Sequence, residues 1–214
     1  MSDRDRLTPG RHQYTLFHVR AMPSIVDDAF NSWCAGRSPI EARISIFNNI
    51  RDIAYAGIPE LVDPQRYVDI LVLRRGSCTP KHLLMGNMYQ RLGLSVLLAA
   101  YPFRWDQLDI DYPRTLRRLA EAMPTGHHLA CRVDIDGRLV LVDATLDLPL
   151  QKLGLPVNDE WDGMRDTALP LPPCGEEQLY HPSEASLLRP QLDSATLAFY
   201  NELNLWLDRV RQSE

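Results

Sequence analysis

The stretch "GSCTPKHLLMGNMYQRLGLSVLLAAY" (residues 76–101) carries the signals for a helix followed by a strand. Pro80 suits the first turn of a helix, and Gly93 is placed just past its end. Between them, apolar residues such as Leu84 and Met88 recur at four-residue spacing, which predicts a helix that crosses the core. The apolar run after Gly93 predicts a buried strand.

A cysteine stands at the start of this predicted helix. Unpaired backbone N–H groups and the positive end of the helix dipole favour the thiolate form of a side chain placed there. The same environment lowers the pKa of reactive thiols. Gly76, Ser77 and Thr79 are small and leave room for a substrate carbonyl. Cys78 is therefore a candidate nucleophile; the alternative is a cysteine that only packs in the core.

A second stretch, "HLACRVDIDGRLVLVDAT" (residues 128–145), predicts a β-hairpin. Asp136-Gly137 is the strongest short-range hairpin signal in the chain. A two-residue turn there pairs Cys131 with Val142. One face then carries only apolar side chains and must pack on the core. These are Leu129, Cys131, Val133, Ile135, Val140, Val142 and Ala144.

The other face of the predicted hairpin carries His128 and Asp143 as diagonal neighbours. Diagonal residues lie roughly 7–8 Å apart at the backbone, within reach of their side chains. The imidazole can donate one N–H to the carboxylate and keep its other nitrogen for a thiol, which is the arrangement of nucleophilic acyl transfer. The alternative is a surface His–carboxylate pair. The same register directs His127 toward the core face.

The remaining segments supply further helices and strands, and their order predicts an α+β fold. Ser38 and Glu41 form a capping-box pattern. Helices are expected over Ser24–Ala35, from Ser38 to just before Gly57, over Pro113–Met123 and over residues 194–212. Residues 67–75 are expected to form a strand or an extended lead-in, and residues 94–103 a strand. Residues 1–23 are expected to form an irregular or extended arm.

A proline-rich segment with seven prolines covers residues 149–193. It is expected to wrap the surface as a belt, because Leu155, Trp161, Leu169 and Leu171 need burial. Trp161 could line a site or pack. The predicted organisation is a single domain over residues 1–214, with a core at about 38–148, the belt at 149–193 and a C-terminal helix at 194–212.

Composition and charge exclude several classes of protein. The 214 residues are 45% hydrophobic and 24% charged, with a formal net charge of −5, so no basic surface indicates nucleic acid. No apolar run reaches the ~20 residues of a membrane span, and the N-terminus lacks an apolar signal segment. Together with four scattered cysteines, expected to be free thiols, this predicts a cytoplasmic protein.

No metal or cofactor is expected. Cys78 and His82 have the spacing of two metal ligands on a helix, but further ligands at metal spacing are missing. Trp105, just after the predicted strand, could border a cleft or belong to the core.

The two quoted stretches together resemble the transglutaminase-like superfamily. The matching features are Gly76-Ser77-Cys78 at a helix start, Leu92-Gly93 at its end, a strand, His128, the Asp136-Gly137 turn and Asp143-Ala144-Thr145. The likeness covers roughly residues 40–148. It implies a papain-like core, in which N-terminal helices and the cysteine helix pack on an antiparallel sheet. It also implies a triad with Cys78 as nucleophile, His128 as base and Asp143 orienting the imidazole.

The resemblance implies cysteine-dependent acyl transfer at an amide, ester or thioester carbonyl through a thioester acyl-enzyme. The acceptor would be an amine or water, and the acyl donor a peptide, a protein or a small molecule. A hydrolytic peptidase or amidase of the same fold is an alternative, as is a non-catalytic binding module that keeps the fold. A weaker likeness, to arylamine N-acetyltransferases, rests on Arg75-Gly76-Ser77-Cys78. Thr79 and Leu129-Ala130 differ from many superfamily members, so the substrate pocket is not specified.

Overall fold

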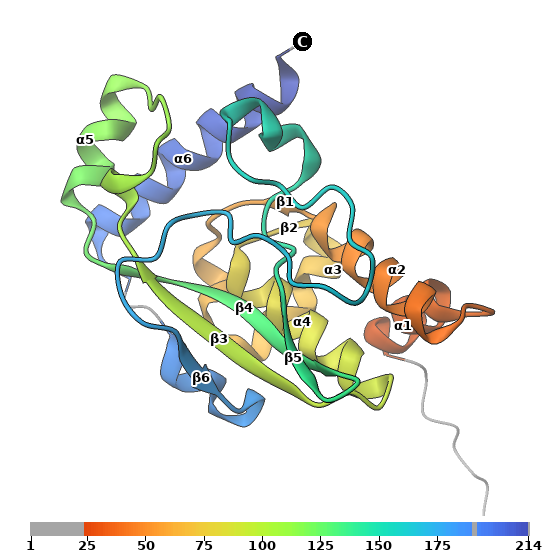
Figure 1. Ribbon diagram of the computed structural model, residues 1–214. Coiled ribbons are helices and arrows are strands. Elements are labelled where there is room, and N and C mark those ends of the chain that lie inside the picture. Colours follow the sequence, from red (N-terminus) through yellow and green to blue (C-terminus); the bar gives the residue numbers. More distant parts are fainter. Residues whose placement is uncertain (1–23, 190–191, 214) are drawn as a thin grey trace, which may run out of the picture.

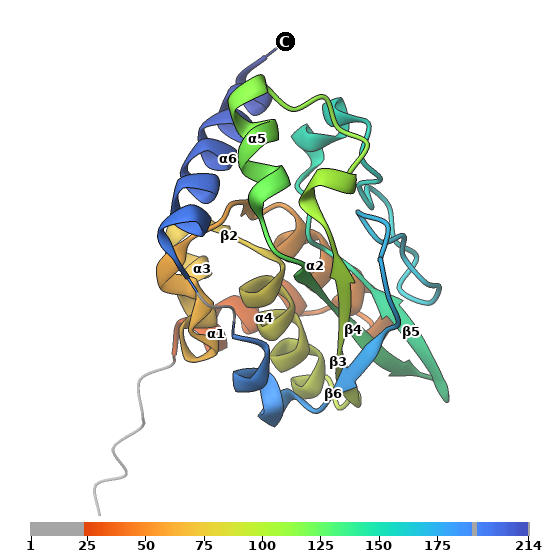
Figure 2. The same cartoon turned by 90° about the vertical axis from the view of Figure 1, so that its left-hand side faces the viewer.

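A four-stranded antiparallel sheet forms the centre of the computed structural model, which describes residues 24–189 and 192–213 (Figure 1). Its strands, in the order β5-β4-β3-β6, are β5 (Arg138–Val142), β4 (Gly126–Ile135), β3 (Val96–Phe103) and β6 (Gln178–Tyr180). Figure 2 shows α4 (Cys78–Arg91) on one side of the sheet and the belt on the other. The predicted α+β class is confirmed.

The β4–β5 hairpin has the predicted turn and register. Asp136 and Gly137 have φ angles of 53° and 80°, the left-handed conformation that a two-residue hairpin turn requires. Cys131 pairs with Val142 across the ladder. The predicted apolar face is buried in the main core, with Cys131 and Val142 fully inaccessible.

Helix α4 fills the space beneath the sheet. Leu84, Met85 and Met88 are fully buried, as the four-residue spacing predicts for a central helix. Beside it lie α1 (Ile25–Cys34) and α2 (Pro39–Arg51). The capping box expected at the start of α2 is present, since Ser38 and Glu41 bond each other's backbone N–H groups.

The end of α2 was predicted wrongly. The helix stops at Arg51 rather than near Gly57, and β1 (Ala54–Tyr55) follows it, parallel to β2 (Arg75–Gly76). Tertiary contacts decide this boundary, because the Lys81 ammonium binds the carbonyls of Arg51 and Ile53. These partners lie about 30 residues away along the chain and outweigh the local helical pattern.

The segment expected to be a strand or extended at residues 67–75 is instead mostly helical. It contains the end of η2 (Pro64–Asp69) and all of α3 (Ile70–Leu73), and η1 (Pro59–Val62) precedes them. Arg74, with φ 53°, ends α3. Ile70 is buried whereas Val72 is 70% exposed. Residues two apart would share one face of a strand, so this difference in burial fits a helix.

A second apolar cluster lies at the end of the molecule where α5 and α6 pack together (Figure 1). The enclosing elements are α5 (Arg114–Ala122), α6 (Ser194–Gln212), η3 (Trp105–Gln107) and η4 (Leu148–Leu153). Phe103, Leu116 and Phe199 are among its buried members. Helix α6 has the predicted bounds.

Part of the belt, around Thr167 and Leu169, covers the face of the sheet opposite α4. Thr167 donates its backbone N–H to the Leu141 carbonyl, and Leu169 packs on a small cluster that includes Tyr101. Trp161 is buried against Phe47, with ring centroids 5.2 Å apart, so it packs.

The belt also contains regular structure that the sequence pattern did not reveal. Strand β6 pairs with β3, and η5 (Pro182–Leu188) follows it. Such an edge strand of three residues is too short for an alternating pattern to be recognised. The arm expected over residues 1–23 lies outside the described residues.

Candidate active site

Cys78 is the first residue of α4, and it is 8% exposed. Ser77 precedes it in extended conformation, and its side chain makes no capping hydrogen bond. The backbone N–H groups of the first turn, at the end of the helix that carries the thiol, therefore have no side-chain oxygen from Ser77 as acceptor. Gly76 permits the tight approach of the chain, because a Cβ there would lie 2.7 Å from Ile70 Cγ2.

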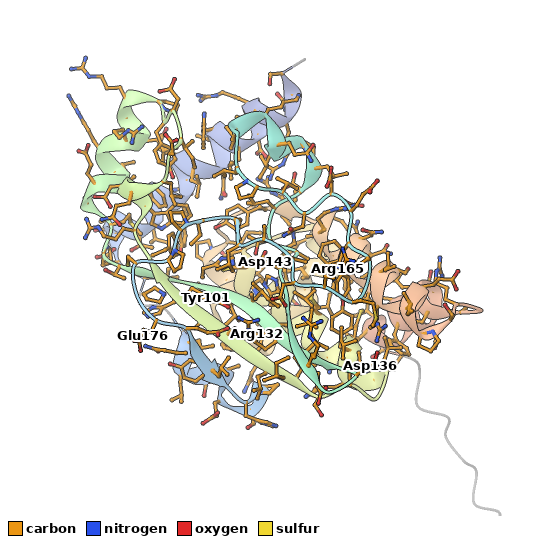
Figure 3. All side chains as sticks on the ribbon, in the orientation of Figure 1. Tyr101, Arg132, Asp136, Asp143, Arg165 and Glu176 are labelled. Carbon is orange, nitrogen blue, oxygen red and sulfur yellow. The ribbon has the colours of Figure 1, made fainter. Side chains whose placement is uncertain are left out.

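His128 and Asp143 meet on neighbouring strands, as the hairpin register predicts. His128 lies on β4 and Asp143 directly follows β5; both are at least 98% buried. Nε2 of His128 is 2.5 Å from Oδ2 of Asp143. Figure 3 places Asp143 inside the molecule and Asp136 at the tip of the hairpin. Since the imidazole bonds the carboxylate through Nε2, Nδ1 is the nitrogen left for Cys78.

The ionisation of Cys78 and His128 is coupled. Burial alone would raise the pKa of the Cys78 thiol, but hydrogen bonding to His128, the imidazolium charge and the Leu129 backbone amide together lower it. Burial would likewise lower the pKa of His128, yet the Asp143 carboxylate and the Cys78 sulfur outweigh burial and raise it to about 10. These directions favour a thiolate–imidazolium pair.

Asp143 is held as a carboxylate in a fixed orientation. Burial would raise its pKa, but the charge and hydrogen bond of His128 lower it below the usual range. Its Oδ1 accepts the backbone N–H of Thr145 at 2.9 Å. Its own backbone is held from the belt, where Thr167 Oγ1 accepts its N–H at 2.8 Å and Asn158 Nδ2 donates to its carbonyl at 3.0 Å.

His82 connects the helix start to the Asp143 segment. Its Nδ1 bonds the Cys78 carbonyl at 2.9 Å, and its Nε2 accepts the Ala144 N–H at 3.1 Å. The ring is fully buried, and burial lowers its pKa to about 4, although Asp143 Oδ1 is 3.9 Å away. His82 is therefore neutral, with its proton on Nδ1, and it fixes the distance between nucleophile and carboxylate.

Lys81 is also fully buried beside the site. Its ammonium donates to the carbonyls of Arg51, Ile53 and Thr145 at 2.7–3.0 Å. Burial lowers its pKa to about 7, while three carbonyl acceptors and the Asp147 carboxylate favour the charged form. The residue ties the end of α2 to the chain just after Asp143.

The structure brings together all three residues of the predicted triad, Cys78, His128 and Asp143. One expectation about their neighbour is wrong: His127 is exposed rather than turned into the core, because it lies next to the end of the β3–β4 ladder, opposite Pro102. From the sequence alone, no role was assigned to Lys81, and His82 was considered only as a metal ligand. The signal that could have found them is their position, one turn into a helix and directly before the buried apolar run Leu83–Met85.

A cavity of about 430 Å³ opens beside the triad. Cys78, Thr79 and His128 form part of its wall, and Trp105 lines it from η3. The cavity lies between the main core and the second apolar cluster. Trp105 therefore borders the cavity, which was one of the two interpretations of its sequence position.

Within the described residues, no group of three or more His, Cys, Asp or Glu side chains is placed to hold a metal ion. Over residues 24–189 and 192–213, no helix combines the length and the apolar character needed to cross a bilayer.

This chain matches no protein-family model, no curated protein and no solved structure. The candidate site therefore depends on the geometry and chemistry of its own residues.

Proposed function

We propose that this protein is a cysteine-dependent acyl-transfer enzyme with a transglutaminase-like, papain-like core. The observation that carries the proposal is the buried 2.5 Å contact between His128 and Asp143, with the Cys78 thiol at the start of α4 sharing the same imidazole. A binding module would have no need to bury this charge-coupled set, because burying ionisable groups costs free energy.

The proposed reaction has two half-reactions. The Cys78 thiolate attacks the carbonyl carbon of an amide, ester or thioester, and His128 gives its proton to the leaving group as the C–S bond forms. An amine or water then attacks the thioester, His128 accepts the proton of that nucleophile, and the thiolate leaves. Asp143 keeps Nε2 protonated throughout, so that Nδ1 exchanges the proton. The backbone N–H of Cys78 is one natural donor to the developing oxyanion.

The order of elements supports the assignment to this superfamily. A cysteine helix is followed by β3, the histidine lies on β4, and the aspartate directly follows β5. The acyl donor is a peptide, a protein or a small acyl compound. Transfer to an amine and hydrolysis use the same acyl-enzyme, so the supply of acceptor decides between them.

The direct test is site-resolved alkylation with iodoacetamide at pH 6, read by mass spectrometry. Cys78 should be labelled faster than Cys174, although Cys174 is exposed and Cys78 is buried. A helix start and an imidazolium increase the thiolate fraction at this pH, whereas a free thiol has a pKa of about 8.5. Faster labelling of Cys174 would contradict the proposal.

Histidine variants sharpen the same experiment. His128→Ala should bring the labelling rate of Cys78 at pH 6 down to that of an ordinary thiol, while His127→Ala should leave the labelling rate of Cys78 high. If Cys78 loses its fast labelling in His127→Ala and keeps it in His128→Ala, the wrong imidazole has been assigned as the base.

A further inference from the structure

The cavity beside Cys78 extends away from the triad into the second apolar cluster. Its far wall includes Phe103, Leu203 and Leu207, which are buried, and Trp206, which is half-buried. A volume of about 430 Å³ falls within the range of roughly 300–1,000 Å³ typical of small-molecule sites. The thiol therefore faces a preformed apolar space rather than open solvent.

The wall of this cavity carries almost no charge. Apart from histidines, Arg189 is the one charged residue among the described lining residues, and it is exposed. An ionic group bound in the interior would lose its hydration without gaining a partner, which is costly. The occupant of the cavity is therefore neutral and mainly apolar.

We infer that the acyl donor carries a long, neutral, apolar acyl group, such as an alkanoyl or arylalkanoyl chain, which occupies this cavity while its carbonyl lies at Cys78. The inference rests on the proposed function, because it names the substrate class of the same site. A glutamine side chain has two methylenes and a polar amide, and it would leave most of this apolar volume unfilled. In the reaction the acyl carbon forms a bond to Sγ, the bond to the leaving group breaks, and His128 protonates that leaving group.

Binding can be measured without catalysis in the Cys78→Ala variant. Isothermal titration calorimetry would compare butanamide, octanamide and 4-phenylbutanamide, which are neutral and unreactive. Each buried methylene should tighten binding about two- to fourfold, so octanamide should bind more than tenfold tighter than butanamide. The phenyl compound distinguishes an aromatic from an aliphatic preference. Octanamide that binds no tighter than butanamide would overturn the inference.

A pair of tryptophan substitutions tests whether binding occurs in this cavity. Leu155 lines it, whereas Val157, two residues along the same segment and also half-buried, does not. Leu155→Trp should weaken octanamide binding at least tenfold, while Val157→Trp should retain it. Leu171 also lines the cavity. If thermal unfolding shows that Leu155→Trp does not fold, Leu171→Trp takes its place. Equal binding by the blocked and control variants would overturn the assignment of the cavity.

Thioester turnover by the wild-type protein separates this inference from the proposed function. With N-acetylcysteamine thioesters and hydroxylamine as acceptor, kcat/KM should rise with chain length from acetyl to octanoyl. A value that is the same for both acyl groups would overturn the inference and leave the proposed function standing. The opposite outcome is also distinguishable. If octanamide binds and Leu155→Trp abolishes that binding, but no thioester is turned over, the apolar site is supported and the proposed function is contradicted.

Discussion

His128 couples the stability of the protein to pH. Its pKa is raised from 6.5 to about 10 in the folded chain, so it contributes stability that is fully present below pH 6.5 and is lost as the pH rises through 10. In the wild-type protein the lowered pKa of Cys78 opposes this effect. A group whose pKa is lowered on folding makes the folded protein more stable as the pH rises.

The Cys78→Ser variant lacks the thiol, so the titration of His128 can be observed without the opposing titration of Cys78. In that variant the free energy of unfolding should fall as the pH rises above 6.5, by at most about 1.4 kcal/mol per pH unit. The fall should end below pH 10, because the Cys78 sulfur no longer helps to raise the pKa of His128. Adding Asp143→Asn should flatten the dependence, because the carboxylate is the main cause that raises the pKa. Urea unfolding at several pH values measures both. A flat profile in Cys78→Ser itself would mean that His128 is not charged in the folded protein.

Two buried tyrosines differ in what their hydroxyl groups contact. Tyr89 donates to the Arg43 carbonyl at 3.2 Å, whereas the Tyr112 hydroxyl has no partner among the described residues. Tyr89→Phe should therefore cost about 1 kcal/mol of unfolding free energy, the usual value of one hydrogen bond. Tyr112→Phe should be neutral or stabilising. Chemical denaturation of the matched pair measures the difference, and an equal loss in both variants would disprove it.

At the scale of elements, Lys81 on α4 joins the end of α2 to the chain just after Asp143. Lys81→Met keeps most of the aliphatic stem but leaves three carbonyls without their donor, and each unsatisfied group costs about 1–3 kcal/mol. The free energy of unfolding should fall by more than about 3 kcal/mol.

Lys152→Met is the matched control, because Lys152 is exposed and surface substitutions usually change stability by less than about 0.5 kcal/mol. Urea unfolding compares the two variants. Equal effects would show that the buried ammonium contributes no more than a surface lysine.

The belt fixes Asp143 through Thr167. Thr167→Val keeps the shape of the side chain but removes the oxygen that accepts the Asp143 N–H. We expect the labelling rate of Cys78 at pH 6 to fall severalfold, because a displaced carboxylate supports the imidazolium less well. Thr115→Val, at an exposed position of α5, should leave the rate unchanged. The same iodoacetamide assay measures both, and an unchanged rate in Thr167→Val would show that the Thr167 hydrogen bond is not needed to position Asp143.

At the scale of the whole molecule, the parts of the fold governed by local rules were predictable. The Asp136-Gly137 turn fixes the register of β4 and β5, and the period of two then puts His128 and Asp143 on one face. The start of α4 follows from Pro80 and from the apolar spacing after it. These features depend on residues a few positions apart, so the candidate triad could be assembled before the structure was known.

The features that were missed depend on long-range contacts. The end of α2 is set by Lys81, and the strand β6 exists because β3 offers a free edge to a distant segment. His82 becomes part of the site only because Ala144 lies against it, 62 residues further along the chain. No local pattern encodes such contacts, so they were accessible only from the folded structure.

The burial of Lys81 has a consequence for self-modification. An acyl-enzyme that transfers to amines can also acylate its own lysines, and this chain has only two, Lys81 and Lys152. Lys81 is inaccessible, while the remaining cationic side chains are arginines, whose guanidinium stays protonated and does not act as a nucleophile. If the proposed function holds, Lys152 is the only lysine side chain that the enzyme exposes to its own reaction.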